Sequence, residues 1–398
     1  MSQSAISPYG IPNVRLFIIF RVLFNARFYY PVFSILFLDF GLTLSQFALL
    51  NVVWAATIVL CEVPSGALAD SVGRRRLLVF AGSLMVVEIA LWAFVPLGNM
   101  TLVFWVFVVN RILSGMAEAA ASGADEALAY DSLKKEGGES EWGRVLERQI
   151  QLQSVGFIVA LTLGGFLYDS DMLQTFSDWL GLGWNLDRET TMRLPLYFTL
   201  MTAILTLLTV LRMREIDDRY RLVRIDRQSI RNSFRLVWQA GSWIFRTPFV
   251  LVLMLFGLIS DSPVRMMITM VSQYYRLIEI PEYLFGVLGS ILALFGFVIP
   301  GIARKLCEKR SPLFNLVLTS STILLGLIGL CFVWPWVGLV PAILLFSSMY
   351  SVGFFLSYYL NQATSSEQRA TVLSFRGLFL NLGYGGIGLL YALLLYFL

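Results

Sequence analysis

The stretch Gly66-Ala67-Leu68-Ala69-Asp70-Ser71-Val72-Gly73-Arg74-Arg75-Arg76 decides the fold of this 398-residue chain. It joins two apolar segments, 49–68 and 77–94, and each is long enough to cross a bilayer as a helix. Gly66 and Gly73 permit the very short turn between them, because glycine tolerates tight reversals and close backbone approach. The three arginines predict that the turn faces the cytoplasm. If the turn only fixed the orientation of the helices in the membrane, the arginines would be explained, but Asp70 and the two glycines at this spacing would not.

The composition is that of a membrane protein. Hydrophobic residues make up 57% of the chain and charged residues 14%, with a mean hydropathy of +0.73. Soluble domains carry about 25% charged residues. Apolar runs of about 20 residues recur along the chain, which predicts an all-α polytopic membrane protein. The net charge of +4 does not indicate nucleic-acid binding, since most of the positive residues lie in loops, where they orient the helices.

Several classes of chemistry have no support in the sequence. Cys61, Cys307 and Cys331 have no paired spacing, so neither a disulfide framework nor a metal site is expected. Histidine is absent, so proton coupling would have to use carboxylates. The sequence contains neither a nucleotide-binding loop nor a nucleophile with its base. We therefore expect no cofactor, no use of ATP and no enzymatic activity.

Hydropathy predicts eleven spans. Basic loops alternate with loops poor in basic residues, which places the N-terminus in the cytoplasm, and we expect no cleavable signal peptide before the first span. Splitting the last span would leave two pieces too short to cross, so it counts as one span and the total stays at eleven. The predicted spans cover about residues 14–38, 47–68, 77–95, 101–130, 150–167, 194–211, 249–274, 283–303, 313–333, 337–360 and 370–398.

A basic stretch divides the chain into two halves. We expect an N-terminal six-helix bundle over residues 1–211, a cytoplasmic linker over 212–246 and a C-terminal bundle with five visible helices over 247–398. Apolar residues among the arginines of the linker, including Trp238, suggest a helix lying on the membrane surface. The basic loop 301–312 lies at the position in the second half that corresponds to the turn at 66–76 in the first half. Such a correspondence is typical of a duplicated unit.

The pattern G-x-L-A-D-x-x-G-R-R-x-L-L, which begins at Gly66, resembles the signature of the major facilitator superfamily (MFS) between its second and third helices. The resemblance implies two pseudo-symmetric helix bundles around a central cavity, closed on the cytoplasmic side by a gate. It also implies twelve spans, so either the given sequence stops before the last helix or the twelfth helix is missing, and we expect the latter. We expect Asp70 to lie near the start of the last span, at about residues 370–371, where the helix N-terminus favours an anion. We also expect Arg74 or Arg75 to reach Asp131. The expected gate residues are Gly66, Asp70, Gly73, Arg74, Arg75 and Asp131.

Ionisable residues inside the spans are the candidate site residues. A charged side chain at the centre of a spanning helix costs about 2.5–3.5 kcal/mol. Arg27, Arg111 and Arg265 lie deep in their spans, so they must face a wet cavity or pair with acids. Asn25 and Tyr30 add a polar and aromatic patch beside Arg27. The acids available inside spans are Glu62, Glu88, Glu118, Asp125, Glu126 and Asp261.

The fourth span carries a stripe of small and charged residues. Arg111, Gly115, Glu118, Ser122 and Asp125 recur at helical steps and are expected to share one face. Such a stripe either lines a cavity or forms a structural seam of salt bridges between helices.

Two further resemblances point to proton-coupled exchange. Arg111-x-x-Ser114-Gly115 resembles the fourth-helix motif R-x-x-Q-G of proton-coupled MFS antiporters, with Ser in place of Gln. The segment 156–165 resembles the fifth-helix antiporter motif, but Ala160 and Leu161 replace its central Gly-Pro. Small residues at this spacing also let helices pack closely, which is a structural role.

Asp261 and Arg265 lie four residues apart on the seventh span and can pair within the helix. Pro263, between them, frees a backbone carbonyl and can kink the helix. The pair is either a transport element or a self-neutralised structural pair.

These observations predict a monomeric, multi-pass transporter of the bacterial inner membrane. It would export a small amphipathic or hydrophobic solute in exchange for protons by alternating access. The alternatives are a proton-driven symporter or lipid-type flippase on the same fold, or a membrane scaffold or sensor that does not transport. Glu118 is expected to carry the proton, and Arg111, Glu88 and Asp261 are the other candidate coupling residues. The expected cavity residues are Asn25, Arg27, Tyr30, Arg111, Gly115, Glu118, Asp261 and Arg265.

Overall fold

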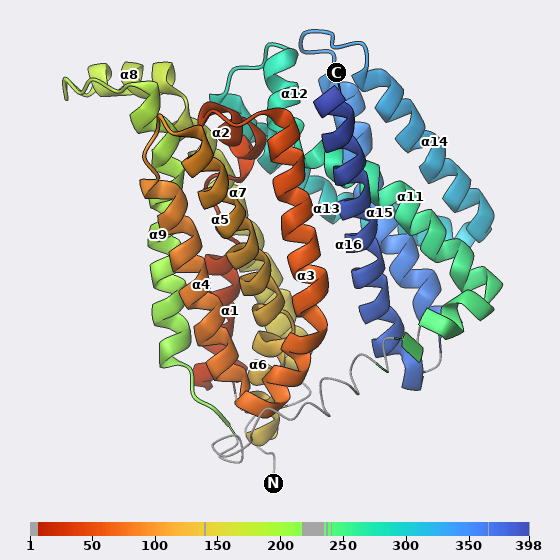
Figure 1. The fold of residues 1–398 in the computed structure, drawn as a ribbon. Coiled ribbons are helices and arrows are strands. Elements are labelled where there is room, and N and C mark those ends of the chain that lie inside the picture. The colour runs from red at the N-terminus through yellow and green to blue at the C-terminus, as the bar shows by residue number, and fades with distance from the viewer. Residues whose placement is uncertain are drawn as a thin grey trace. The chain divides into compact units, whose positions relative to one another are not determined.

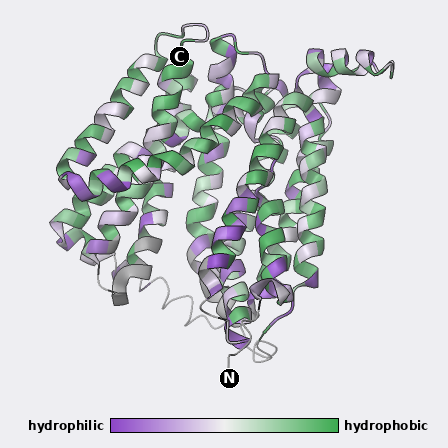
Figure 2. Cartoon of the chain, turned by 180° about the vertical axis from the view of Figure 1, so that it is seen from behind, coloured by the Kyte–Doolittle hydropathy of each residue, from purple (hydrophilic) through white to green (hydrophobic). Residues whose placement is uncertain are grey.

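All regular elements in the described part of the chain are helices (Figure 1). The computed structural model describes residues 7–138, 141–216, 235, 238–239, 241–364 and 366–397. Within these ranges, the side chains of 63, 66–72, 143, 361, 366–371 and 373–374 are not described. Eleven helical segments in the described residues are long and apolar enough to cross a membrane, which confirms the eleven predicted spans. Apolar residues cover most of their length (Figure 2).

The chain forms two compact units. The first comprises Met1–Tyr30 and Leu60–Ser233, and the second comprises Pro31–Val59 and Phe234–Leu398. Residues 31–59 thus pack with the second half of the chain, although they lie within the first half of the sequence. Much of the linker at 212–246 lies outside the described residues. The described part of the predicted surface helix, residues 235, 238–239 and 241–246, is helical, and Trp238 is exposed.

The first unit contains seven described helices, together with the end of α3. Gly82 of α4 lies directly against the backbone of Leu207 in α9, so these two helices approach closely. Arg193 of α9 donates hydrogen bonds to the carbonyls of Ala93 and Val95 at the end of α4, at 2.8 and 2.9 Å. The helices are α1 (Pro12–Asn25), α4 (Arg74–Phe94), α5 (Met100–Ala121), α6 (Ala124–Lys135), α7 (Trp142–Tyr168), α8 (Ser170–Trp179) and α9 (Arg188–Arg212).

The first predicted span is broken in the middle. Helix α1 ends at Asn25, and a helical path resumes only at residue 30, so Arg27 stands on irregular backbone. Threonines of α9 bind the freed backbone groups: the amide of Phe28 donates to Thr199 Oγ1 at 3.0 Å, and Thr202 Oγ1 donates to the carbonyl of Ala26 at 3.2 Å. Irregular backbone at membrane depth is tolerated where protein groups satisfy it in this way.

The fourth predicted span is also two helices, and the predicted stripe is wrong beyond Glu118. Helix α5 ends at Ala121, and Gly123 has a positive φ of 75° before α6 begins. The break turns Asp125 away from the face that carries Arg111. Asp125 instead forms an ion pair with Arg21 of α1.

The second unit holds the last five spans and part of the first two. Gly257 of α11 faces Leu380 of α16, and Gly383 of α16 faces Leu258 of α11, which permits close packing of these helices. The helices are α2 (Phe33–Asp39), α11 (Pro248–Thr269), α12 (Val271–Leu277), α13 (Tyr283–Lys309), α14 (Pro312–Leu330), α15 (Leu339–Ala363) and α16 (Ser366–Phe397). Helix α3 (Leu44–Val72) begins in the second unit and ends in the first.

Helices α2 and α12 lie side by side within the second unit (Figure 1). The hydroxyls of Ser34 and Ser272 lie 2.7 Å apart, and each also accepts a hydrogen bond from a backbone amide of the other helix. At the ends of the two helices, Arg276 binds both oxygens of Asp39, at 2.9 and 2.8 Å, and Glu282 at 2.7 Å. These contacts fix the far end of the first span to the second unit.

Candidate functional site: a buried charge cluster

The centre of the cluster is Arg27, on the irregular segment of the first span. Its Nη1 donates to Glu88 Oε1 of α4 and to the Tyr29 hydroxyl, both at 3.0 Å. Its Nη2 lies 4.0 Å from Glu118 Oε2 of α5 and has no hydrogen-bond partner among the described residues. The guanidinium also lies 5.4 Å from the centre of the Phe24 ring. One arginine is thus shared between two carboxylates from different helices.

The two carboxylates differ in their access to the surroundings. Glu88 is fully buried, whereas the side chain of Glu118 is 50% exposed. A buried ion pair with good geometry tolerates loss of solvent, but removing one partner leaves an uncompensated buried charge. Glu88 is therefore the buried partner of Arg27, and Glu118 is the more accessible of the two acids.

Arg111 is buried beside this cluster. Its Nε and Nη2 donate to the Asn110 side-chain oxygen, both at 3.1 Å, and the guanidinium lies 5.0 Å from the centre of the Trp92 ring. Asn110 in turn donates to the backbone carbonyl of Glu88 at 2.9 Å. Asn110 and Trp92 were not identified from the sequence, because neither carries a charge or belongs to a motif.

The remaining predicted cavity residues of the first unit surround Arg27 or lie close to it along the chain. Tyr30 is 39% exposed and its ring centre is 6.0 Å from the Arg27 guanidinium. Asn25 donates to the carbonyl of Arg21 at 2.8 Å, so its amide is used locally. Gly115 is buried on α5. The first unit therefore brings together Arg27, Tyr30, Glu88 and Glu118, and Asn110 links Arg111 to the backbone of Glu88.

The segment that resembles the fifth-helix antiporter motif packs against the break in the first span. A side chain on Gly164 would collide with the backbone carbonyl of Phe28, and one on Gly156 would meet Val22 at 2.8 Å. Ala160 is fully buried with Ala26 and Phe28. These glycines have the structural packing role that the spacing predicts.

The turn between α3 and α4 holds two of the three signature arginines in specific contacts. Gly73 has a φ of 102°, a conformation that favours glycine. Arg74 forms an ion pair with Asp131 of α6, which confirms the predicted contact. Arg75 donates to the carbonyls of Leu211 and Met213 at the end of α9, at 2.9 and 2.6 Å. Basic side chains at a helix C-terminus satisfy such unpaired carbonyls.

The rest of the expected gate cannot be placed. The side chains of Gly66, Asp70 and residues 370–371 lie outside the described residues, so the contact of Asp70 with the last span stays a prediction.

In the second unit, Asp261 and Arg265 form the predicted ion pair within α11. Arg265 Nη2 lies 2.6 Å from Asp261 Oδ2, and Nη1 donates to Asn381 of α16 at 2.8 Å. The Arg265 guanidinium also lies 5.4 Å from the centre of the Tyr384 ring. The pair is therefore not isolated, since it is tied to a neighbouring helix.

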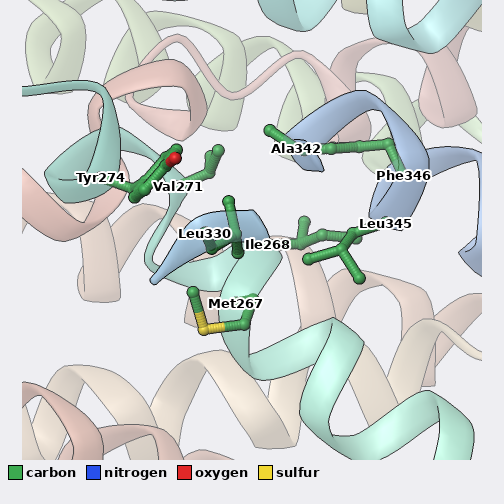
Figure 3. Close-up of a pocket in the computed structure, with 8 residues that line it drawn as sticks. All are labelled: Met267, Ile268, Val271, Tyr274, Leu330, Ala342, Leu345 and Phe346. Carbon is green, nitrogen blue, oxygen red and sulfur yellow. The ribbon is translucent and has the colours of Figure 1, made fainter. Parts of the chain in front are cut away.

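A small pocket in the second unit does not fit a solute. Its volume is ≈ 10 Å³, room for about one water. Tyr274 of α12 borders it and donates its hydroxyl to the carbonyl of Gly338 at 3.3 Å, and burial raises the pKa of this tyrosine. The pocket is otherwise apolar, and its lining residues are Met267, Ile268, Val271, Tyr274, Leu330, Ala342, Leu345 and Phe346 (Figure 3).

The spans and the buried charges define a polytopic membrane transporter. The chain belongs to the Major Facilitator Superfamily, whose family model matches residues 16–395. It is therefore a transporter and not an enzyme. A comparison with curated protein sequences gives no match.

Solved transporter structures share this fold. The nucleoside transporter NupG is 13% identical, with a TM-score of 0.71 over 96% of this chain and 89% of that chain. A bacterial homolog of the human lysosomal transporter Spinster, in an inward-facing conformation, is 15% identical, with a TM-score of 0.70 over 98% and 82%. A D-xylose-proton symporter is 13% identical, with a TM-score of 0.62 over 96% and 90%. At these identities the likeness shows the fold alone.

Proposed function

We propose that this chain exports a small amphipathic or hydrophobic solute in exchange for protons, as a secondary active transporter that works by alternating access. The observation that carries the proposal is the position of Arg27 between a sealed carboxylate, Glu88, and a half-exposed one, Glu118. The resemblance of Arg111-x-x-Ser114-Gly115 to the antiporter motif also supports exchange.

The cluster gives protonation a defined electrostatic effect. Arg27, Arg111, Glu88 and Glu118 together carry two positive and two negative charges when both acids are ionised. A proton on Glu118 leaves the 3.0 Å pair of Arg27 and Glu88 intact and gives the cluster one net positive charge. Charge changes act strongly in a medium of low dielectric constant. Proton binding at Glu118 and solute binding nearby therefore influence each other, which is what coupling requires.

The proposed gates lie at the two ends of the first spans. We assign Arg74, Asp131 and the Arg75 contacts to the cytoplasmic side, together with Asp70 near residues 370–371. We assign the Asp39–Arg276 pair between α2 and α12 to the opposite side. With this assignment the N-terminus is cytoplasmic. We further propose that the protein acts as a monomer in the inner membrane of a bacterial cell.

A proton-driven symporter or lipid-type flippase is the second candidate. It is favoured by Ala160 and Leu161, which replace the central Gly-Pro of the fifth-helix antiporter motif. The two candidates differ in the direction in which protons and solute move relative to each other.

Flux in proteoliposomes tests the proposal. Purified protein is first screened for solutes that raise its thermal stability, and a stabilising solute is then added outside vesicles that contain a pH-sensitive dye. Exchange predicts that solute entry makes the lumen more alkaline, because protons leave. Acidification of the lumen would instead favour the symporter, and solute binding without any flux would favour the scaffold or sensor.

A further inference from the structure

The spanning helices of the second unit contain an excess of positive charge. Away from the helix ends, the described Asp, Glu, Lys and Arg side chains of these helices are Asp261 and Arg265 of α11 and Arg376 of α16. Helices α14 and α15, and residues 44–59 of α3, carry no charged residue. Two arginines thus share a single carboxylate.

Arg265 has its partners within the unit. It pairs with Asp261 at 2.6 Å and donates to Asn381 at 2.8 Å. This one guanidinium thus contacts both the carboxylate and the side-chain oxygen of Asn381.

Arg376 is left without such a partner. Its Nε and Nη1 are buried, and neither has a hydrogen-bond partner in the part of the chain that the structure describes. Asp261 is near enough to interact with Arg376 electrostatically, but that carboxylate is bound by Arg265. A guanidinium presents its donors in a fixed fork that matches carboxylates and phosphates. Its unused donors therefore call for an acceptor that the described residues do not provide.

We propose that Arg376, next to the Asp261–Arg265 pair, binds the anionic group of the transported solute. This proposal rests on the proposed transport function and narrows its solute to amphipathic anions. Aromatic side chains lie beside the same cluster: the Tyr384 ring is 5.4 Å from the Arg265 guanidinium, and the Trp54 ring centre lies 6.5 Å from that of Tyr384. They suit the apolar body of such a solute, because aromatic rings add large apolar contact areas.

An anionic solute also fixes how exchange responds to voltage. Export of one anion for entry of one proton moves two positive charges inward, so an inside-negative potential drives both movements. Symport of the same anion with one proton moves no net charge. Flux that is independent of the potential would thus contradict exchange but leave the anion site standing.

Three small aromatic probes of equal size test the site: benzoate, benzyl alcohol and benzylamine. Thermal unfolding of the detergent-purified protein, followed by tryptophan fluorescence, reports binding without requiring transport. We expect benzoate to stabilise the protein saturably, and the neutral and cationic probes to have much less effect. Stabilisation by benzyl alcohol or benzylamine equal to that by benzoate would overturn the proposal, whatever the transport assay gives.

Variants assign the binding to Arg376. Arg376→Gln should bind benzoate about 10- to 100-fold more weakly, the factor expected for a lost hydrogen bond between charged groups. Arg376→Lys keeps the charge but loses the fork, so it should be intermediate. Arg304→Gln is the control, since Arg304 is an arginine of the same unit with a 65% exposed side chain. Unchanged benzoate affinity in either Arg376→Gln or Arg376→Lys would refute the role of the guanidinium fork.

Discussion

Breaking the ion pair between Arg27 and Glu88 should lower the free energy of unfolding by more than breaking any exposed ion pair of the chain. The two groups lie 3.0 Å apart and are 3% and 0% exposed. Replacing Glu88 by Gln removes the negative charge and leaves the Arg27 guanidinium buried, 4.0 Å from its remaining acid, Glu118. Breaking a buried pair in this way costs about 3–5 kcal/mol. Arg27→Gln should cost a similar amount, because it strands Glu88.

The double substitution makes this prediction specific. With both charges removed, neither is left unpaired, so Arg27→Gln/Glu88→Gln should be less destabilised than the sum of the single variants. Coupling energies of residues in contact are typically about 0.5–3 kcal/mol. Denaturant unfolding in detergent micelles, followed by tryptophan fluorescence, measures the four free energies of unfolding.

An exposed pair provides the control for this cycle. Arg144 and Glu141 are 2.9 Å apart, and the Arg144 side chain is 74% exposed. Pairs of this kind contribute about 0–1 kcal/mol, so Glu141→Gln should have little effect. Additive losses in the Arg27/Glu88 cycle, or a Glu88→Gln loss no larger than that of Glu141→Gln, would refute the reasoning that this pair is a coupled, buried centre.

Three further predictions test other parts of the structure. Arg276→Gln should loosen α2 from α12, so a cysteine placed at Ser34, in a background without native cysteines, should react faster with a maleimide than it does when Arg276 is retained. Gly164→Ala should sharply lower the yield of folded protein in size-exclusion chromatography, because the added Cβ would meet backbone that cannot move aside. The control Gly353→Ala should be tolerated, since no atom lies within 4 Å of its added Cβ. Hydrogen bonds with the start of α9 lower the pKa of Asp187. The ionised carboxylate therefore stabilises the folded protein above the pKa of the unfolded state, and this stabilisation is lost as the pH falls through the lower pKa of the folded state. Asp187→Asn should abolish this part of the pH dependence in thermal unfolding between about pH 5 and pH 2.

The number and order of the spans were predictable from the sequence, but their interruptions were not. Runs of about 20 apolar residues mark a span whatever its local backbone does. The break after Asn25 depends on two threonines of α9, which is distant in the sequence. Thr199 accepts a hydrogen bond from a freed backbone amide, and Thr202 donates one to a freed carbonyl. Nothing near Asn25 in the sequence reports them. Gly123 did give a local signal for the second break, but a glycine inside an apolar run is a weak one.

The amphipathic helix α8 was missed for a different reason. The segment between the fifth and sixth spans reads as a polar loop because acids are spread through it. In the structure, Met172, Phe176 and Trp179 follow helical spacing in α8 and are exposed together. A search for helical periodicity, rather than mean polarity, would have found it.

The candidate site was predictable in its members but not in its pairs. The cost of burying a charge identified Arg27, Glu88, Arg111 and Glu118 one by one. Helical spacing then suggested that Arg111 and Glu118 belong together, whereas the structure joins Arg27 to Glu88 across two helices. Which charged residues of different helices form ion pairs depends on how the helices pack, and this packing cannot be predicted from a single sequence.

The most direct test of the central claim is proton-driven flux in Glu118→Gln proteoliposomes. The variant keeps the Arg27–Glu88 pair and removes only the half-exposed acid. Glu136→Gln, an exposed carboxylate at the end of α6, is the matched control. With a solute identified by thermal stabilisation, Glu118→Gln should lose solute movement driven by a pH gradient while retaining most of the solute exchange at equal pH, and Glu136→Gln should retain both. A full response of Glu118→Gln to the pH gradient would contradict the account and leave Glu118 as a structural partner of Arg27.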